Sequence, residues 1–256
     1  MEKRLNGKVA VVTGSTSGIG AGIVAAFAAE GAKIVVSGRR RERGEEVATA
    51  ACKVGGEAVF HQTDVLKPED CEAVCRRAAD EFGGLDILVN NAGVFPRATL
   101  EETDADLWDQ IFDINVRGPF LCSRAAVPLM RRRGGGSIIN IGSGNAFGFY
   151  PPLFAYCTSK SALHAMTMRM ARILAPDRIR VNWITVGWIL TEKEFEIQAG
   201  EGHDREWLEK HKADLPMGEY NTVEDVAAAC VYLAGDAAVR VTGADLAAAA
   251  GMGIHI

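Results

Sequence analysis

The sequence lacks an apolar run long enough to cross a bilayer, and its first eight residues contain no apolar signal core. It also lacks a strong charge of either sign, since the formal net charge is -5 over 256 residues. This mildly acidic balance argues against nucleic acid or an anionic membrane as the main partner. We therefore expect a soluble, cytoplasmic protein whose partner is a small molecule.

The sequence has no cysteine or histidine pattern typical of a metal site. Its six cysteines are scattered, and without a secretion signal they are expected to be reduced thiols. Cys71 and Cys75 would share a helical face, but no histidine lies near them in the sequence. We expect no bound metal.

No linker rich in proline or serine divides the chain, and no repeat is present. Short apolar runs alternate with helical patterns, which is typical of βαβ units. We predict one α/β domain over residues 1–256, a Rossmann-like, doubly wound parallel sheet with helices on both faces. The predicted strands cover residues 8–12, 33–37, 57–61, 85–89, 137–141, 178–184 and 241–246. The predicted helices cover residues 18–30, 41–53, 68–82, 106–133 (which Pro119 and Pro128 can bend or interrupt), 154–174 and 222–234.

A glycine-rich segment follows the first predicted strand. Gly14, Gly18 and Gly20, together with Ser17 and Ile19, lead into the first helix. Glycine lets the backbone approach a pyrophosphate, and a helix N-terminus offers free N–H groups and partial positive charge. The segment predicts a dinucleotide site; the alternative is a turn that only connects strand to helix.

An acidic residue is absent where the second strand ends. NAD-binding folds of this type commonly place a carboxylate there for the adenine ribose, whereas this chain has Gly38 followed by Arg39. A guanidinium suits the 2′-phosphate, so we expect NADP to be favoured over NAD. A solvated Arg39, or one stacked on the adenine, is the alternative. Asp64 and Val65 follow the third strand and are expected near the adenine, unless Asp64 only caps the next helix.

Tyr156 and Lys160 lie four residues apart on a predicted helix, thirteen residues after Ser143. A carbonyl that accepts a hydride needs a proton donor, and a tyrosine phenol can supply one. Lys160 would lie one turn on, where its charge is expected to lower the pKa of Tyr156. Ser143 is expected to hydrogen-bond the substrate oxygen. A packed aromatic, a solvated lysine and a capping serine are the non-catalytic alternatives.

These motifs, in this order, resemble those of the short-chain dehydrogenase/reductase family over nearly the whole chain. The matching residues are 13–20, the run Asn90, Asn91, Ala92 and Gly93, then Asn115, Ser143, Tyr156 and Lys160. The resemblance implies a nicotinamide cofactor, a water held by Asn115, and cofactor contacts from Val186, Ile189 and Thr191. It also implies a homo-oligomer, dimer or tetramer, formed through the helices at residues 106–133 and 154–174.

Two segments depart from the family pattern. Val186 stands where the family commonly has proline before Gly187, so this loop is expected to be looser. The alanine run at residues 247–250 replaces the family's Val-Asp-Gly stretch before Gly251, which affects C-terminal packing and subunit contacts but not the catalytic residues.

The substrate pocket is expected around Asn145 and Trp188, which would contact the substrate. Other predicted lining residues are Val94, Phe95, Pro96, Arg97 and Phe147. Residues 187–221 lose clean periodicity and are predicted to form a lid, with Phe195, His203 and Trp207 near the pocket.

Together these features predict an NAD(P)-dependent oxidoreductase that interconverts a carbonyl compound and a secondary alcohol. An epimerase or dehydratase on the same scaffold, or a non-catalytic nucleotide-sensing protein, are the alternatives.

Overall fold

The computed structural model describes residues 3–148 and 150–252. Seven parallel strands form one sheet in the order β3-β2-β1-β4-β5-β6-β7. The strands are β1 Val9–Val12, β2 Lys33–Gly38, β3 Glu57–Gln62, β4 Ile87–Asn90, β5 Gly136–Ile141, β6 Ile179–Val186 and β7 Asp245–Ala248. The order reverses between β1 and β4, which is where ligands bind in open α/β sheets. The predicted fold class is confirmed.

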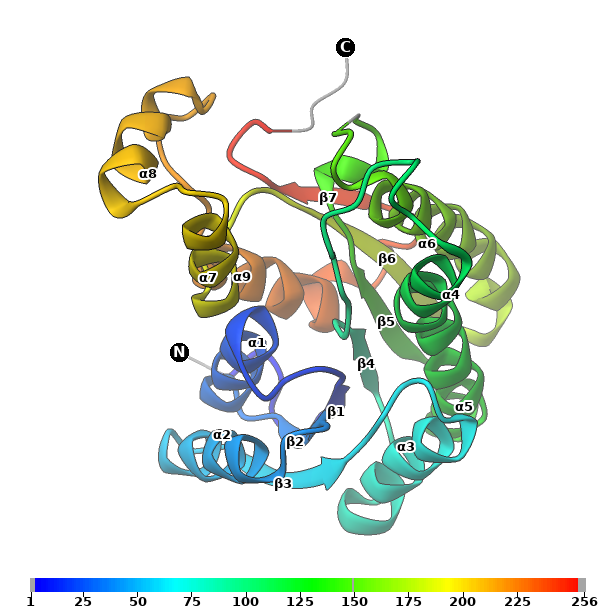
Figure 1. The fold of residues 1–256 in the computed structure, drawn as a ribbon. Helices are drawn as coiled ribbons and strands as arrows, with labels where there is room; N and C mark the ends of the chain where they lie inside the picture. Colours follow the sequence, from blue (N-terminus) through cyan, green and yellow to red (C-terminus); the bar gives the residue numbers. More distant parts are fainter. Residues whose placement is uncertain (1–2, 149, 253–256) are drawn as a thin grey trace.

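Helices cover both faces of the sheet (Figure 1). On one face lie α1 Gly18–Ala29, α2 Arg41–Lys53 and α9 Val223–Ala234; on the other lie α3 Pro68–Phe82, α5 Gly118–Arg133 and α6 Phe154–Leu174. The short helical turns are η2 Gly144–Ala146, η3 Ala175–Asp177, η4 Lys212–Asp214 and η5 Asp236–Ala238. Alternate residues of β1 enter opposite cores, Ala10 and Val12 on the α1 side and Val9 and Val11 on the α3 side. The period of two along each strand therefore builds two apolar layers.

The predicted helix over residues 106–133 is interrupted in the structure. It consists of α4 Ala105–Phe112, a π-helical turn η1 Asp113–Arg117, and α5. The break precedes Pro119, which lies in the first turn of α5, where a missing N–H costs little. The π turn contains the candidate site residue Asn115, in keeping with the frequent placement of such bulges at functional sites.

The last strand lies further along the chain than predicted. The sequence pattern predicts a strand over residues 241–246, whereas β7 covers Asp245–Ala248. The side chain of Asn182 donates to the Val241 carbonyl and accepts from the Ala244 amide, which holds the approach to the strand against β6. Pairing of Asp245 with Trp183 then sets the register, so packing overrides the weak β-propensity of alanine.

The segment at residues 187–221 is partly helical. It contains α7 Glu192–Gly200 and α8 Arg205–His211, which lie beyond the sheet in the upper left of Figure 1. Side chains of Thr191 and Asp204 cap the two helices by accepting the amides of Glu194 and Trp207. The prediction of an aperiodic loop was therefore wrong in detail, because each helix is too short to show a clear period.

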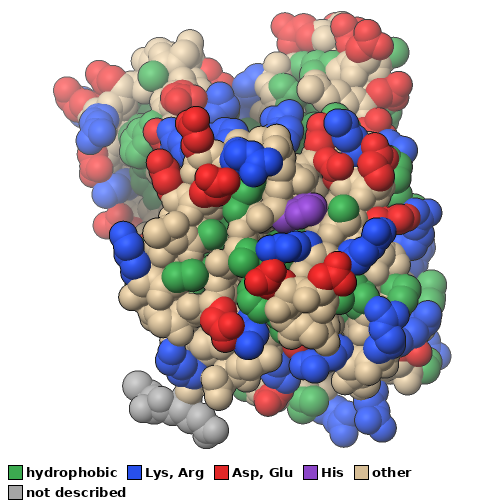
Figure 2. Space-filling view, turned by 90° about the horizontal axis from the view of Figure 1, so that it is seen from below, with side chains coloured by type: hydrophobic (Ala, Val, Ile, Leu, Met, Phe, Trp, Pro, Cys, Tyr) green, Lys and Arg blue, Asp and Glu red, His purple; other side chains and the backbone are tan. Residues whose placement is uncertain are grey.

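The molecule's lower side mixes charges of both signs. Figure 2 shows lysine, arginine, aspartate and glutamate side chains interspersed, with hydrophobic side chains in small separate groups. Such a surface fits the small net charge of the chain. Among the residues placed in the structure, none of the helices has the length and apolar character needed to span a membrane.

Candidate active site

A cavity of about 790 Å³ opens at the carboxyl edge of the sheet. Residues that follow β1, β4, β5 and β6 line it together, as the strand order predicts. They include Ile19, Asn91 and Gly93, then Ser143 and Asn145, then Tyr156 and Lys160, and Val186, Trp188, Ile189 and Thr191. The volume lies within the range typical of small-molecule and cofactor sites.

The glycine-rich turn lies at this edge of the sheet, where neighbouring backbone leaves little space for a side chain. Gly14 has a φ of 63°, and a Cβ there would lie 2.7 Å from the Cα of Ala92. The Asn91 amide donates to the carbonyls of Thr13 and Gly14, which fixes the turn against the segment after β4. A Cβ at Gly18 would meet only Thr191, at 3.5 Å.

The N-terminus of α1 is open to a ligand. Ser17 is its N-cap residue, but the Ser17 side chain accepts no capping hydrogen bond from the first turn. The first-turn amides are therefore available for an anion. The residues present fit the phosphates of a dinucleotide, with Gly14, Ser17, Gly18, Ile19 and Gly20 around them.

Arg40, rather than Arg39, reaches the glycine-rich turn. Its guanidinium donates to the hydroxyls of Thr16, at 3.0 Å, and Ser17, at 2.6 Å. Arg39 is exposed, and its carbonyl accepts from the Gln62 amide. Arg40 is not among the site residues predicted from the sequence, because the pattern does not show which way the side chains of adjacent residues point at the end of a strand.

Asp64 and Val65 follow β3. Asp64 Oδ1 accepts the Leu66 amide, which forms a local turn ahead of α3. The N-cap of α3 is Lys67, so Asp64 does not cap that helix. The side chain of Val65 lies close to Gly118, at 3.1 Å from a Cβ built there. Neither residue is among those that line the cavity described above. Their contact with adenine stays a prediction.

Asn90 belongs to a buried polar network instead of the cavity. Its amide donates to Ser123 and to Asn140, and the Asn140 amide donates to Thr167. These bonds tie β4 and β5 to α5 and α6. The side chain of Asn90 therefore supports the sheet and does not line the cavity, whereas Asn91 does.

Tyr156 and Ser143 face each other across the cavity wall. Tyr156 lies in the first turn of α6, and Ser143 follows β5 as the N-cap of η2. The Ser143 hydroxyl is near enough to the phenol to act on its pKa, which it lowers. The Ser143 hydroxyl also accepts the amide of Asn145 at 3.2 Å. A carbonyl oxygen placed between the two hydroxyls could bind both.

Lys160 lies one turn beyond Tyr156; its side chain is buried, whereas Tyr156 is partly buried. Its ammonium donates to the Ile141 carbonyl at 2.8 Å and lies 5.8 Å from the centre of the Tyr156 ring. Burial lowers the pKa of Lys160 to about 8.

Burial also raises the pKa of Tyr156 to about 12, against smaller lowering influences from Ser143 and Arg97. The expectation that Lys160 brings the pKa of Tyr156 below its ordinary value is therefore wrong for this structure. The physical reason is that loss of hydration is the largest influence on the pKa of this phenol. At neutral pH the phenol holds its proton.

Asn115 lies in the π turn and binds the segment after β4. Its Oδ1 accepts the Val94 amide, and its amide donates to the Val94 carbonyl and to Ser159. Both amide hydrogens are thus used within the protein. The water linked to Lys160 stays a prediction, and the side chain could bind it only through the remaining acceptor capacity of Oδ1.

The predicted substrate residues divide into two groups. Phe95, Arg97, Asn145, Trp188, His203 and Trp207 line the cavity. Val94, Pro96, Phe147 and Phe195 do not appear among its walls. The Phe147 ring packs edge-on against His164 and Trp183, and Phe195 lies under the Arg205 guanidinium, so both rings are used elsewhere.

A polar cluster on α7 was not predicted from the sequence. Glu194, Gln198 and Glu201 line the cavity from one helical face, and the spacing of four and then three residues was the available signal. Arg97 donates to Glu194 at 3.2 Å and to Glu201 at 3.0 Å. Glu194 also accepts from the Trp188 indole and from Gln198. These bonds join α7 to the segment after β4.

Comparison with known proteins gives the same assignment along most of the chain. A family model described as "Enoyl-(Acyl carrier protein) reductase" matches residues 14–253. The D-beta-hydroxybutyrate dehydrogenase of Rhizobium meliloti is 37% identical over 92% of this chain and 95% of that protein. The D-threitol dehydrogenase of Mycolicibacterium smegmatis is 37% identical over 95% of this chain and 92% of that protein.

Solved structures agree in fold. A putative short-chain alcohol dehydrogenase from Sinorhizobium meliloti superposes with a TM-score of 0.91 at 35% identity, with 98% of each chain covered. A short-chain dehydrogenase/reductase from Serratia marcescens gives a TM-score of 0.90 at 37% identity, covering 98% of this chain and all of that one. With the Tyr156 and Lys160 pair, the glycine-rich turn and the strand order in place, the chain belongs to the short-chain dehydrogenase/reductase family of alcohol and carbonyl oxidoreductases.

Proposed function

We propose that this protein is an NAD(P)-dependent oxidoreductase that interconverts a carbonyl compound and a secondary alcohol, with Tyr156 as the general acid/base. The convergence of Ser143, Tyr156 and Lys160 on one cavity beside the glycine-rich turn carries the proposal. A bound nicotinamide would supply or accept the hydride. Incubation with a panel of ketones and alcohols, followed by reduced-nicotinamide absorbance, tests it. An epimerase or dehydratase would leave the cofactor unconsumed.

Ser143, Tyr156 and Lys160 have different roles at the substrate oxygen. Ser143 orients the oxygen through its hydroxyl, and Tyr156, protonated at neutral pH, donates the proton as the alcohol forms. Lys160 supplies a positive charge close to the phenol when Tyr156 must act as a base in the reverse direction. The segment of α7 and α8 acts as a lid over this site, and the expected homo-oligomer through α4, α5 and α6 stays a prediction.

NADP is proposed as the preferred cofactor. No carboxylate stands at the end of β2, and a Cβ at Gly38 would approach Thr16 Cγ2 to 2.7 Å, so a longer side chain would force Thr16 to shift. Arg39 is exposed beside this point and is free of ion pairs with the described residues. Its guanidinium can therefore bind a 2′-phosphate.

Substitution of the two arginines separates their roles. Arg39→Ala should lower NADPH affinity roughly tenfold to a hundredfold and leave NADH affinity unchanged, since one charge-assisted bond is lost. Arg40→Ala should weaken both cofactors alike, because Arg40 holds Thr16 and Ser17 of the shared turn. Dissociation constants from fluorescence titration measure both effects. Equal affinities of the parent protein for NADPH and NADH would contradict the preference.

The substrate is proposed to be uncharged near the lid. Arg97 lines the cavity beside α7 and could pair with a substrate carboxylate. Its guanidinium, however, is already paired with Glu194 and Glu201. Two carboxylates against one guanidinium leave this wall with excess negative charge, which repels an anion. The aromatic rings of Phe95, Trp188 and Trp207 complete an apolar wall.

A matched pair of substrates tests this wall. An aryl ketone bearing a methyl ester should have a kcat/KM about tenfold or more above that of its free carboxylate, because the carboxylate finds no unpaired cation on the wall formed by Arg97, Glu194 and Glu201. The double variant Glu194→Gln, Glu201→Gln should reduce this difference in kcat/KM, because Arg97 can then pair with the substrate carboxylate. Glu196→Gln, which removes an exposed charge from the outer side of α7, is the control and should leave the difference unchanged. Equal use of ester and carboxylate by the parent enzyme would refute the inference.

A further inference from the structure

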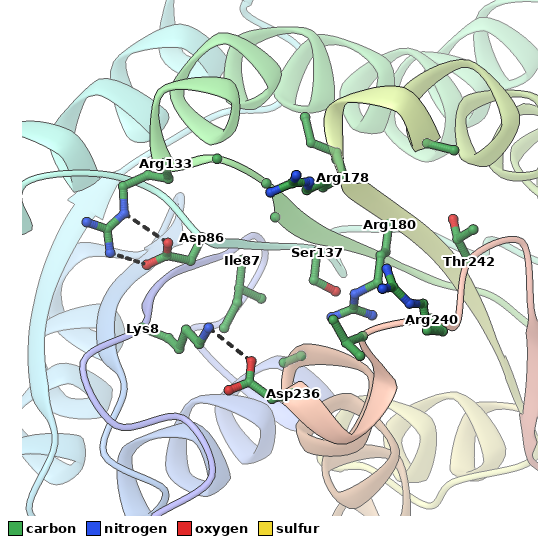
Figure 3. Close-up of a pocket in the computed structure, with 18 residues that line it drawn as sticks. Lys8, Asp86, Ile87, Arg133, Ser137, Arg178, Arg180, Asp236, Arg240 and Thr242 are labelled. Atoms are coloured by element: carbon green, nitrogen blue, oxygen red, sulfur yellow. Dashed lines mark hydrogen bonds and ion pairs between the residues drawn. The ribbon is translucent and has the colours of Figure 1, made fainter.

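A second cavity, of about 400 Å³, lies at the amino edge of the sheet, opposite the active site. Figure 3 shows it between the starts of β5 and β6 and the segment that joins α9 to β7. Residues at the starts of β1 and β4 complete the wall. Neither the proposed reaction nor the cofactor uses this part of the molecule.

Positive charge is concentrated in this cavity although the whole chain is acidic. Five basic and two acidic side chains line it. Lys8 pairs with Asp236 at 3.2 Å, and Arg133 pairs with Asp86 at 2.9 Å. The remaining basic residues, Arg178, Arg180 and Arg240, form no ion pair with any residue that the structure describes. The cavity therefore has an excess of three positive charges.

Arg180 carries a charge that the protein compensates only in part. Its side chain is half-buried on β6, and its guanidinium donates to the Val241 carbonyl at 3.4 Å. Burial lowers the pKa of Arg180, and the opposing influence of Asp236 is smaller. Asp236 is bound to Lys8 instead. A half-buried cation without a carboxylate partner is costly unless an anion joins it.

Arg178 and Arg240 extend the basic wall on either side. Arg178 adopts a left-handed backbone, with a φ of 57°, which is uncommon outside glycine and asparagine. A Cβ at Gly135 would lie 2.7 Å from its carbonyl oxygen, so the glycine segment packs directly on Arg178. The amides of Gly134, Gly135 and Gly136 already bind backbone carbonyls. Side-chain guanidinium groups, rather than backbone amides, are therefore the groups available to a ligand (Figure 3).

We propose that this cavity binds a small, multiply charged phosphate compound of the diphosphate type. Three guanidinium groups in one cavity can each offer a planar pair of donors to phosphate oxygens. The volume is at the lower end for ligand sites, which suits a diphosphate with at most a small substituent. The site lies at the opposite ends of β5 and β6 from Ser143 and Val186, so it is separate from the dinucleotide site.

Calorimetric titration of the full chain with inorganic diphosphate tests the proposal. Binding should be saturable at low ionic strength and should weaken when sodium chloride is added. Arg180→Gln and Arg240→Gln should each weaken it about tenfold, because one charge-assisted contact is lost. Arg240 is exposed, so its replacement leaves folding intact and decides the outcome if the Arg180 variant is unstable.

Two control variants distinguish binding in this cavity from a general charge effect and from binding at the dinucleotide site. Arg76→Gln makes the same change of net charge at an exposed position on α3 and should bind diphosphate like the parent. Arg40→Gln alters the glycine-rich turn and should also bind normally. Absence of saturable binding, loss in Arg40→Gln alone, or equal loss in Arg76→Gln and Arg240→Gln would each overturn the proposal.

Discussion

Replacing Tyr156 with phenylalanine should lower kcat roughly a hundredfold to ten-thousandfold, the range attributed to general acid catalysis. The substitution removes only the phenolic hydroxyl that meets Ser143, and it keeps the ring that packs edge-on against Phe95 at 6.0 Å. Cofactor affinity should therefore change little. Steady-state kinetics with the best ketone of the panel, together with a cofactor titration, measure both quantities.

The pH dependence adds a second check on the same residue. Because burial raises the pKa of Tyr156 to about 12, carbonyl reduction should show no loss of the acid between pH 6 and about 9. Alcohol oxidation, which needs the phenolate, should accelerate as pH rises from 6 to about 8, the range in which Lys160 keeps its charge. Tyr232→Phe, on the surface of α9, serves as the matched control. Turnover within a fewfold of the parent in the Tyr156 variant would show that another group donates the proton.

Local periodicity was sufficient to predict several helices, including the one that contains Tyr156 and Lys160. The predicted helices at residues 41–53, 68–82 and 154–174 have the bounds of α2, α3 and α6. Each has a clear end signal, such as Pro68 at the start of α3 and Gly83 just after it. Tyr156 and Lys160 could be paired from sequence because a helix places residues four apart on one face.

Features set by distant contacts could not be predicted in the same way. The π turn around Asn115 depends on bonds to Val94 and Ser159, and the register of β7 depends on Asn182. The contact of Arg40 with Thr16 joins two segments through the sheet edge. None of these interactions has a local sequence signal, so each appears only when the strands are assembled.

The same limit applies to the electrostatics of the site. A lysine one turn from a tyrosine suggests a lowered phenol pKa, but the loss of hydration of both groups is a property of the folded core. Tyr156 and Lys160 are each shifted toward their neutral forms, with a pKa of about 12 and about 8. The protein therefore keeps two poorly hydrated groups close together at a cost in stability, as is frequent at functional sites.

Lys160→Met should show how much the buried lysine lowers the free energy of unfolding. The lysine pKa falls from an ordinary value of 10.5 to about 8 in the folded protein, so folding disfavours its charged form. Between pH 8 and 10.5 the unfolded chain binds more protons than the folded one, and stability rises with pH. A shift of this size corresponds to roughly 3 kcal/mol, and the whole of that penalty is present below pH 8.

The variant should therefore lose turnover without losing stability at neutral pH. Methionine fills the apolar space without a buried charge, and the Ile141 carbonyl loses its donor, which costs about 1 kcal/mol. At pH 7 the net gain in unfolding free energy should be about 2 kcal/mol, and it should shrink toward pH 10.5. Alcohol oxidation should fall roughly a hundredfold, because the phenolate of Tyr156 loses its neighbouring cation.

Urea unfolding at pH 7 and at pH 10, paired with oxidation kinetics at pH 7, measures both effects. Lys53→Met, at the exposed end of α2, is the matched control and should change neither the pH profile nor turnover. If the unfolding free energies of Lys160→Met and the parent change with pH in parallel across this range, burial does not lower the pKa of Lys160. If the profiles converge as expected but oxidation is unaffected, Lys160 is buried for packing alone and the catalytic role passes to Tyr156 and Ser143.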